Sequence, residues 1–183
     1  MINELYKIWS DNDLSLLSIR AQTNLSYHLA IMLEDKSSEI LNTQRLRIDN
    51  TDQLREFDFV RRACVSDTAD LRALFNSLLH KENRTVEPWA EKTLALLNHP
   101  SREPWSNWMI FPALEKLLEV QQTGDIFFPS KWIGALLGGH TSKEAYELVK
   151  KFDSKIASKN NYPIPLRNKL LQEGGKLYTI WED

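Results

Sequence analysis

Apolar residues recur along the chain at intervals of three and four, the spacing that places side chains on one face of a helix. The clearest run, over residues 67–80, has apolar residues at Leu71, Leu74, Phe75, Leu78 and Leu79. No stretch of five or more residues alternates apolar and polar side chains as a half-buried strand does. The pattern predicts helices at about 2–9, 21–34, 36–48, 51–64, 67–80, 87–98, 105–123, 130–138, 142–157 and 165–181.

The breaks between these segments have the side chains that begin and end helices. Asn50 and Asp67 precede apolar runs, where a side-chain oxygen can accept a free N–H group of the first turn. Thr141 and Glu144 have the spacing of a capping box, directly after the turn Gly138-Gly139-His140. We therefore expect one helix to end at these glycines and the next to start at once.

Short turns between helices favour antiparallel neighbours. Paired in order, the helices predict an all-α fold of stacked antiparallel hairpins, a HEAT-like α–α superhelix of about ten helices. No sequence repeat occurs at a fixed period, so a compact irregular bundle is the alternative. Pro112 interrupts the segment 105–123 and should kink or split that helix. The first 87 residues contain no glycine or proline, which also argues against a fold rich in tight β turns.

Composition narrows the class of protein. The net charge of −2 lacks the basic excess of a dedicated nucleic-acid binder, so we expect no nucleic-acid partner. The longest apolar runs span only a few residues, so we expect no membrane insertion. The single cysteine, Cys64, allows neither an internal disulfide nor a thiolate zinc site.

Residues that usually carry catalysis are scattered. The four histidines are His28, His80, His99 and His140, and no two stand at the i, i+4 spacing of a helical zinc site. No G-x-S-x-G, G-x-x-x-x-G-K-[ST] or G-x-G-x-x-G segment occurs. We therefore expect no catalytic, metal-binding or cofactor-binding residue in this chain. An enzyme in its own right is the least favoured of the function classes.

Four segments in the second half resemble a known family. They are Glu82-Asn83-Arg84-x-x-Glu87-Pro88-Trp89, Thr123-Gly124-Asp125-Ile126-Phe127-Phe128-Pro129-x-x-Trp132, Leu137-Gly138-Gly139-His140-Thr141-Ser142-x-Glu144-Ala145 and Tyr162-Pro163-x-Pro165-Leu166-Arg167-x-Lys169. Their order and spacing resemble the C-terminal helical domain of aminopeptidase N-like zinc metallopeptidases, in a bacterial branch. The resemblance covers about a hundred residues and is faint in the first half.

The resemblance implies a role without chemistry of its own. In this family a separate catalytic domain binds zinc through H-E-x-x-H, and the helical domain closes over the substrate chamber. No H-E dipeptide occurs here. Residues 1–183 are thus expected to form a single, catalytically silent C-terminal domain, a fragment of a longer chain. Zinc is expected in the missing catalytic domain, and the expected partners are that domain of the same polypeptide and peptide substrates.

Two further expectations concern the cellular compartment and the class of function. The resemblance implies a soluble protein of a bacterial cytoplasm or periplasm, without deciding between them. The alternative function is a free-standing helical-repeat scaffold that binds other proteins through a concave groove.

One group of residues is a candidate for contact with peptides in the chamber: Asn83, Arg84, Glu87 and Trp89. The guanidinium of Arg84 has the geometry to pair with the C-terminal carboxylate of a peptide. The alternative interpretation is structural, with Glu87 in the first turn of a helix that a neighbouring proline preorganises.

A second group lies in the loop after Gly124. Phe127, Phe128 and Trp132 are predicted to pin this loop to the core.

Overall fold

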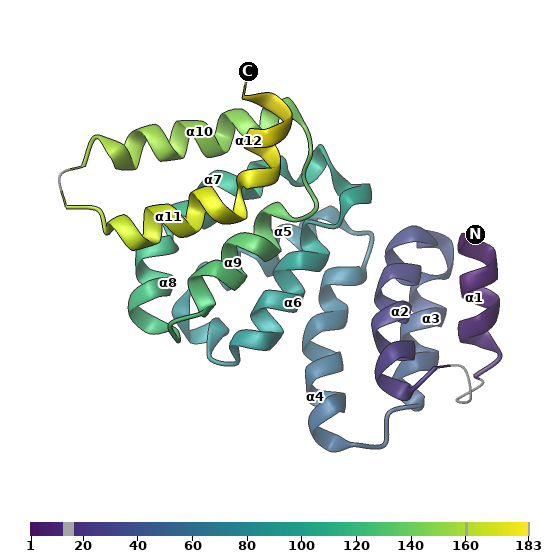
Figure 1. Ribbon diagram of the computed structural model, residues 1–183. Helices are drawn as coiled ribbons and strands as arrows, with labels where there is room; N and C mark the ends of the chain where they lie inside the picture. The colour runs from purple at the N-terminus through teal and green to yellow at the C-terminus, as the bar shows by residue number, and fades with distance from the viewer. Residues whose placement is uncertain (13–16, 160, 183) are drawn as a thin grey trace. The chain divides into compact units, whose positions relative to one another are not determined.

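Every regular element in residues 1–12, 17–159 and 161–182, the part of the chain that the computed structural model describes, is helical (Figure 1). These residues form twelve α-helices and five short 3-10 helices. The predicted all-α class is therefore confirmed, with twelve α-helices in place of about ten.

The chain divides into two compact units, Met1–Leu74 and Phe75–Asp183. The first unit contains α1 (Ile2–Ser10), α2 (Ile19–Met32), η1 (Glu34–Lys36), α3 (Ser37–Leu46), α4 (Thr51–Val60) and η2 (Arg61–Cys64). The helix α5 (Thr68–Leu78) begins in the first unit and ends in the second. That residues 1–183 act as one domain stays a prediction.

In the first unit, helices that are neighbours in sequence pack on one another. α1 contacts α2, and α2 contacts α3 after the short connection through η1 (Figure 1). The buried indole of Trp9 donates from Nε1 to Oε1 of Gln44 at 2.8 Å, and Nε2 of Gln44 donates to Oγ1 of Thr23 at 2.9 Å. This polar chain joins α1, α3 and α2, so the first unit contains the predicted kind of hairpin packing.

The second unit contains all four segments that carry the family resemblance. Its elements are η3 (Lys81–Arg84), α6 (Glu87–Leu97), η4 (Pro100–Arg102), η5 (Trp105–Met109), α7 (Ile110–Glu115), α8 (Leu117–Thr123), α9 (Phe128–Leu137), α10 (Lys143–Ala157), α11 (Ile164–Glu173) and α12 (Gly175–Trp181). Here the main contacts join helices that are distant in sequence. α9 packs against both α6 and α11, and α10 packs against α7 and α12 (Figure 1).

Three of the predicted helices are divided, and in 51–64 the 3-10 helix η2 follows α4. In place of 105–123 stand η5, α7 and α8, and the first α-helix of this segment begins at Ile110, so that Pro112 falls in its first turn. A proline there leaves no intrahelical hydrogen bond broken. In place of 165–181 stand α11 and α12, which meet at Gly174. A Cβ at Gly174 would lie 2.9 Å from the carbonyl oxygen of Leu170, so the close turn needs a glycine.

The helix starts follow the predicted capping, with one change. Asn50 accepts two N–H groups at the start of α4, and Asp67 accepts two at the start of α5, as predicted. At α10 the capping side chain is Ser142 rather than Thr141, and it accepts the N–H of Ala145 at 3.2 Å. The predicted box is therefore wrong by one position, because the hydroxyl and the backbone N–H of Thr141 both donate to a distant carboxylate, that of Glu103.

Candidate functional site

The second unit holds a buried arginine next to a cavity. Arg84, the last residue of η3, has a side chain that is only 2% exposed. Its Nη1 donates to the carbonyl oxygen of Leu78 at 2.7 Å, and its Nη2 donates to Oε1 of Glu119 at 2.6 Å. The guanidinium carbon lies 5.4 Å from the ring centroid of Trp132. These partners are what a buried cation needs, because an isolated charge in the interior is strongly unfavourable.

The ion pair also acts on the acid. The hydrogen bond from Arg84 is the main cause of a lowered pKa at Glu119, and burial opposes it. Nearby, the ammonium of Lys116 lies 3.4 Å from the same carboxylate and lowers the pKa further. Glu119 is 37% exposed, so water reaches the acid although it scarcely reaches the arginine.

The loop before α9 is fixed by Glu87 in the first turn of α6. Oε1 of Glu87 accepts the backbone N–H of Asp125 at 2.8 Å. Oδ1 of Asp125 in turn accepts the N–H groups of Phe127 and Phe128 at 2.7 and 2.8 Å. A Cβ on Gly124 would lie 2.6 Å from Cδ1 of Phe128 and 2.9 Å from the Glu87 carboxylate. The close approach of loop and helix therefore requires glycine at this position.

A half-open cavity of about 350 Å³ lies between η3, the start of α6 and this loop. It is lined by Lys81, Glu82, Arg84, Thr85, Glu87, Thr123, Gly124 and Phe128. Among the described residues, the Nε of Arg84 has no hydrogen-bond partner. Its lining holds both cations and carboxylates, which suits a group with both donors and acceptors, such as a peptide segment, better than a lone ion.

Two of the four predicted contact residues line this cavity, and two do not. Arg84 and Glu87 are in its wall. Asn83 is exposed outside it and donates from Nδ2 to the carbonyl oxygen of Ser77 at 3.0 Å. Trp89 is half-buried on α6 and is also outside the lining. Both Nη atoms of Arg84 are engaged within the fold, so a peptide carboxylate at that guanidinium would have to bind at Nε or displace Glu119.

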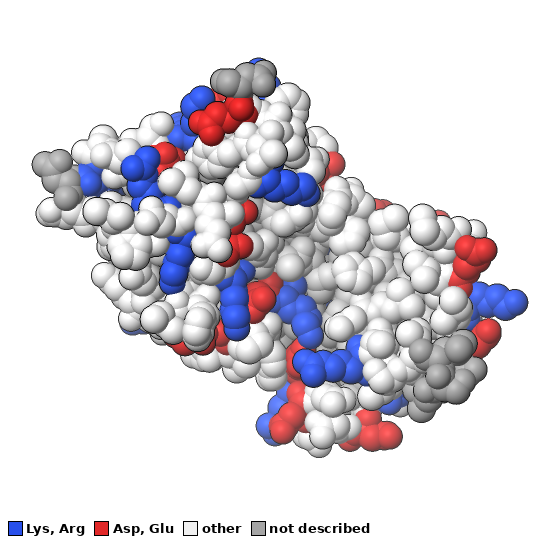
Figure 2. Space-filling model, in the orientation of Figure 1, with Lys and Arg blue, Asp and Glu red and all other residues white. Residues whose placement is uncertain are grey.

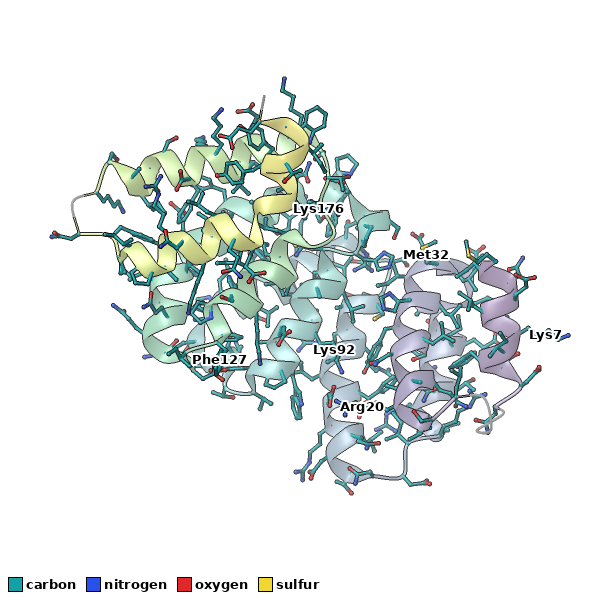
Figure 3. All side chains as sticks on the ribbon, in the orientation of Figure 1. Lys7, Arg20, Met32, Lys92, Phe127 and Lys176 are labelled. Atoms are coloured by element: carbon teal, nitrogen blue, oxygen red, sulfur yellow. The ribbon has the colours of Figure 1, made fainter. Side chains whose placement is uncertain are left out.

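Of the three aromatic residues predicted to pin the loop, two are buried and one is exposed. Phe128 and Trp132 are fully buried, as predicted, and the Trp132 indole donates to the carbonyl oxygen of Ala113. For Phe127 the prediction is wrong: it is 67% exposed, next to Ile126 at 75%. Figure 3 labels Phe127 at the periphery of its unit. Asp125 caps the loop backbone so that these two side chains face solvent.

The sequence pattern does not single out several residues that line or adjoin the cavity. Glu119 is 35 positions from Arg84, and no local pattern links the two. Lys81, Thr85 and Thr123 are polar residues at element ends, where charged and hydroxyl side chains are common for structural reasons alone. Gly124 belongs to a resembling segment and is expected from the sequence only to end a helix, whereas the structure also leaves no room for a Cβ beside Phe128 and Glu87.

On the face that Figure 2 shows, lysine and arginine side chains are interspersed with acidic ones. Among the described helices, none is long and apolar enough to cross a bilayer. Within the same residues no group of three or more His, Cys, Asp and Glu side chains is placed to hold a metal ion.

Comparison with protein-family models, with curated proteins and with solved structures finds no match to this chain. The family resemblance therefore rests on the four sequence segments alone.

Proposed function

We propose that this chain is the non-catalytic helical domain of a zinc-dependent aminopeptidase that removes N-terminal residues from peptides. Its role is to close the substrate chamber and control which molecules enter. Its partners are the catalytic domain of the same polypeptide and the peptide substrates. Zinc and the catalytic groups belong to that other domain, and this chain contributes none of them.

The observation that supports this proposal is the way in which three of the resembling segments meet. Glu87, from the first segment, accepts a backbone N–H of Asp125 in the second. Lys169, from the fourth, donates from Nζ to the carbonyl oxygen of Ile126 at 2.7 Å. These contacts fix the backbone beside the cavity. A chamber wall must present such a fixed surface, because loop ordering on substrate binding costs affinity.

The third segment is held equally closely within the same unit. A Cβ at Gly139 would lie 1.8 Å from the carbonyl oxygen of Asn98, so the turn between α9 and α10 touches the end of α6 backbone to backbone. The four segments are thus structural joints of one unit. This arrangement accounts for their residue types without a catalytic role for any of them.

The test is a comparison between the complete gene product and a version that lacks these 183 residues. The proposal predicts that the complete protein cleaves short peptides and rejects folded proteins with accessible N-termini. The truncated version should lose this discrimination, while a single-residue chromogenic substrate reports whether the catalytic domain is intact. Unchanged discrimination in a truncated version that still cleaves the chromogenic substrate would refute the chamber-closing role.

The scaffold alternative makes a different prediction. If the complete gene product contains no zinc-binding domain, the helical units act alone and bind other proteins. The exposed apolar pair Ile126 and Phe127 is the specific observation that keeps this class open, because contiguous exposed apolar side chains commonly mark contact surfaces. A complete gene product that binds zinc stoichiometrically would exclude the alternative.

A further inference from the structure

His140 is completely buried in the turn between α9 and α10. Its Nε2 lies 2.9 Å from Oδ1 of Asn98. Its Nδ1 lies 3.4 Å from Oε1 of Glu103 and makes no hydrogen bond among the described residues. A buried imidazole nitrogen without a partner calls for an explanation, since most buried polar atoms are hydrogen-bonded.

The neighbours of the ring determine which nitrogen carries the proton. Nδ2 of Asn98 donates to the carbonyl oxygen of Leu94 at 3.0 Å, which leaves the amide oxygen facing His140. An amide oxygen only accepts, so Nε2 of His140 must be the donor. In the neutral ring Nδ1 then bears a lone pair, and this lone pair faces a carboxylate.

That carboxylate is firmly ionised. Glu103 accepts the N–H groups of Thr141 and Ser142, at 3.1 and 2.9 Å, and the hydroxyl of Thr141 at 3.2 Å. Burial raises its pKa, but the hydrogen bonds from Ser142 and Thr141 outweigh burial and lower it to about 2. The contact between Nδ1 and Glu103 is therefore lone pair against anion, and a single added proton makes it N–H against anion.

Opposing effects act on the pKa of His140. Burial lowers the pKa of His140 most strongly, Glu103 raises it, and Lys176 on α12 lowers it again. The net direction is downward, so the ring is neutral at pH 7. From α6 the facing group is the uncharged Asn98, and on α10 the carboxylate of Glu144 is occupied by the amide of Asn107.

We propose that His140 is a proton switch for the start of α10 and for the C-terminal helix. Uptake of one proton at Nδ1 makes a third N–H group that competes for Oε1 of Glu103 with the N–H groups of Thr141 and Ser142. The carbonyl oxygen of Thr141 accepts the indole N–H of Trp181 at 2.8 Å, so a shift of this turn is passed to α12.

The sign of the effect on stability follows from the lowered pKa. On acidification the unfolded chain takes up a proton near the ordinary value, before the folded chain does. The ratio of folded to unfolded protein then falls by up to tenfold per pH unit, until the folded ring is also charged. The contribution of a neutral His140 is fully present above the unfolded pKa.

The test uses the 183-residue chain. Long-range ¹H–¹⁵N spectra of the imidazoles should show His140 at neutral pH with Nε2 protonated and Nδ1 bare. Its midpoint should lie below the ordinary histidine value, measured on the same chain unfolded in urea, and the indole N–H signal of Trp181 should shift with the same midpoint. A protonated Nδ1 at neutral pH, a midpoint equal to that of the unfolded chain, or an unmoved Trp181 signal would overturn the proposal.

Variants give a second measurement. His140→Gln should reduce the dependence of the unfolding free energy on pH by up to one proton, and an unchanged dependence would contradict the proposal. Glu103→Gln replaces the anion by an amide that can donate to Nδ1, so the midpoint of His140 should move to still lower pH. A midpoint that stays the same or rises in Glu103→Gln would contradict the assigned contact, and the spectra of the unaltered chain remain decisive if a variant fails to fold.

Discussion

Removal of the acid that pairs with the buried arginine tests the energetics of the candidate site. Glu119→Leu leaves the guanidinium of Arg84 without its counter-charge, in a place where its side chain is only 2% exposed. The carbonyl oxygen of Leu78 remains as an acceptor, but it cannot neutralise the charge. We therefore expect a clear loss of stability in the second unit.

The magnitude follows from how much water reaches the pair. Breaking a fully buried pair by removing one partner costs about 3–5 kcal/mol. Glu119 is 37% exposed, which weakens its interaction with Arg84 through solvent screening, so we expect a loss of about 2–3 kcal/mol. The double variant Arg84→Met/Glu119→Leu removes both charges and should be no less stable than Glu119→Leu alone.

The assay is denaturant unfolding followed by tryptophan fluorescence, with the midpoint and the slope fitted separately. The matched control is Glu115→Leu on α7, which removes a carboxylate paired with Lys155 on the surface of the same unit. Such exposed pairs contribute about 0–1 kcal/mol. A loss for Glu119→Leu no larger than that of the control would refute the reasoning, as would a double variant clearly less stable than the single one.

Three other predictions concern joints elsewhere in the chain. Gly139→Ala should lower the free energy of unfolding by more than about 3 kcal/mol, because its Cβ would meet a backbone oxygen at 1.8 Å. In the control Gly175→Ala the Cβ meets nothing, so this variant should be more stable by about 0.5–1 kcal/mol. Thermal unfolding compares the two variants. The pKa of Glu103, lowered to about 2, implies a stabilisation of the fold of up to about 3 kcal/mol. This stabilisation should be fully present above pH 4.5, the ordinary pKa of the group, and should fade as the pH falls towards 2. The difference in unfolding free energy between the unaltered chain and Glu103→Gln, measured across this pH range, checks it. Gln44→Leu should cost about 1–3 kcal/mol by leaving the Trp9 indole without an acceptor, measured by denaturant unfolding.

The helical class and most helix positions could be predicted from spacing and capping alone. Asn50 and Asp67 show why: a cap acts over two or three residues, so its consequence is local. The division at Gly174 was missed because apolar residues keep helical spacing on both sides of it. The turn leaves no room for a Cβ at Gly174, which would lie 2.9 Å from the carbonyl oxygen of Leu170, and apolar spacing does not reveal this.

The candidate site was predictable only in part. Arg84 and Glu87 stood out because they belong to the first of the resembling segments, and both line the cavity. Glu119 did not, because its partner is brought near only by the packing of η3 against α8. Phe127 was misplaced for a similar reason, since the direction of its side chain depends on a backbone held by the distant Glu87 and by Asp125.

The most direct test of the proposed function is the zinc content and activity of the complete gene product, measured beside the 183-residue chain. The account predicts one zinc ion per complete polypeptide and release of free N-terminal amino acids from peptides. The 183-residue chain alone should show neither. A complete gene product without zinc or aminopeptidase activity, or release of amino acids by the isolated chain, would contradict the account.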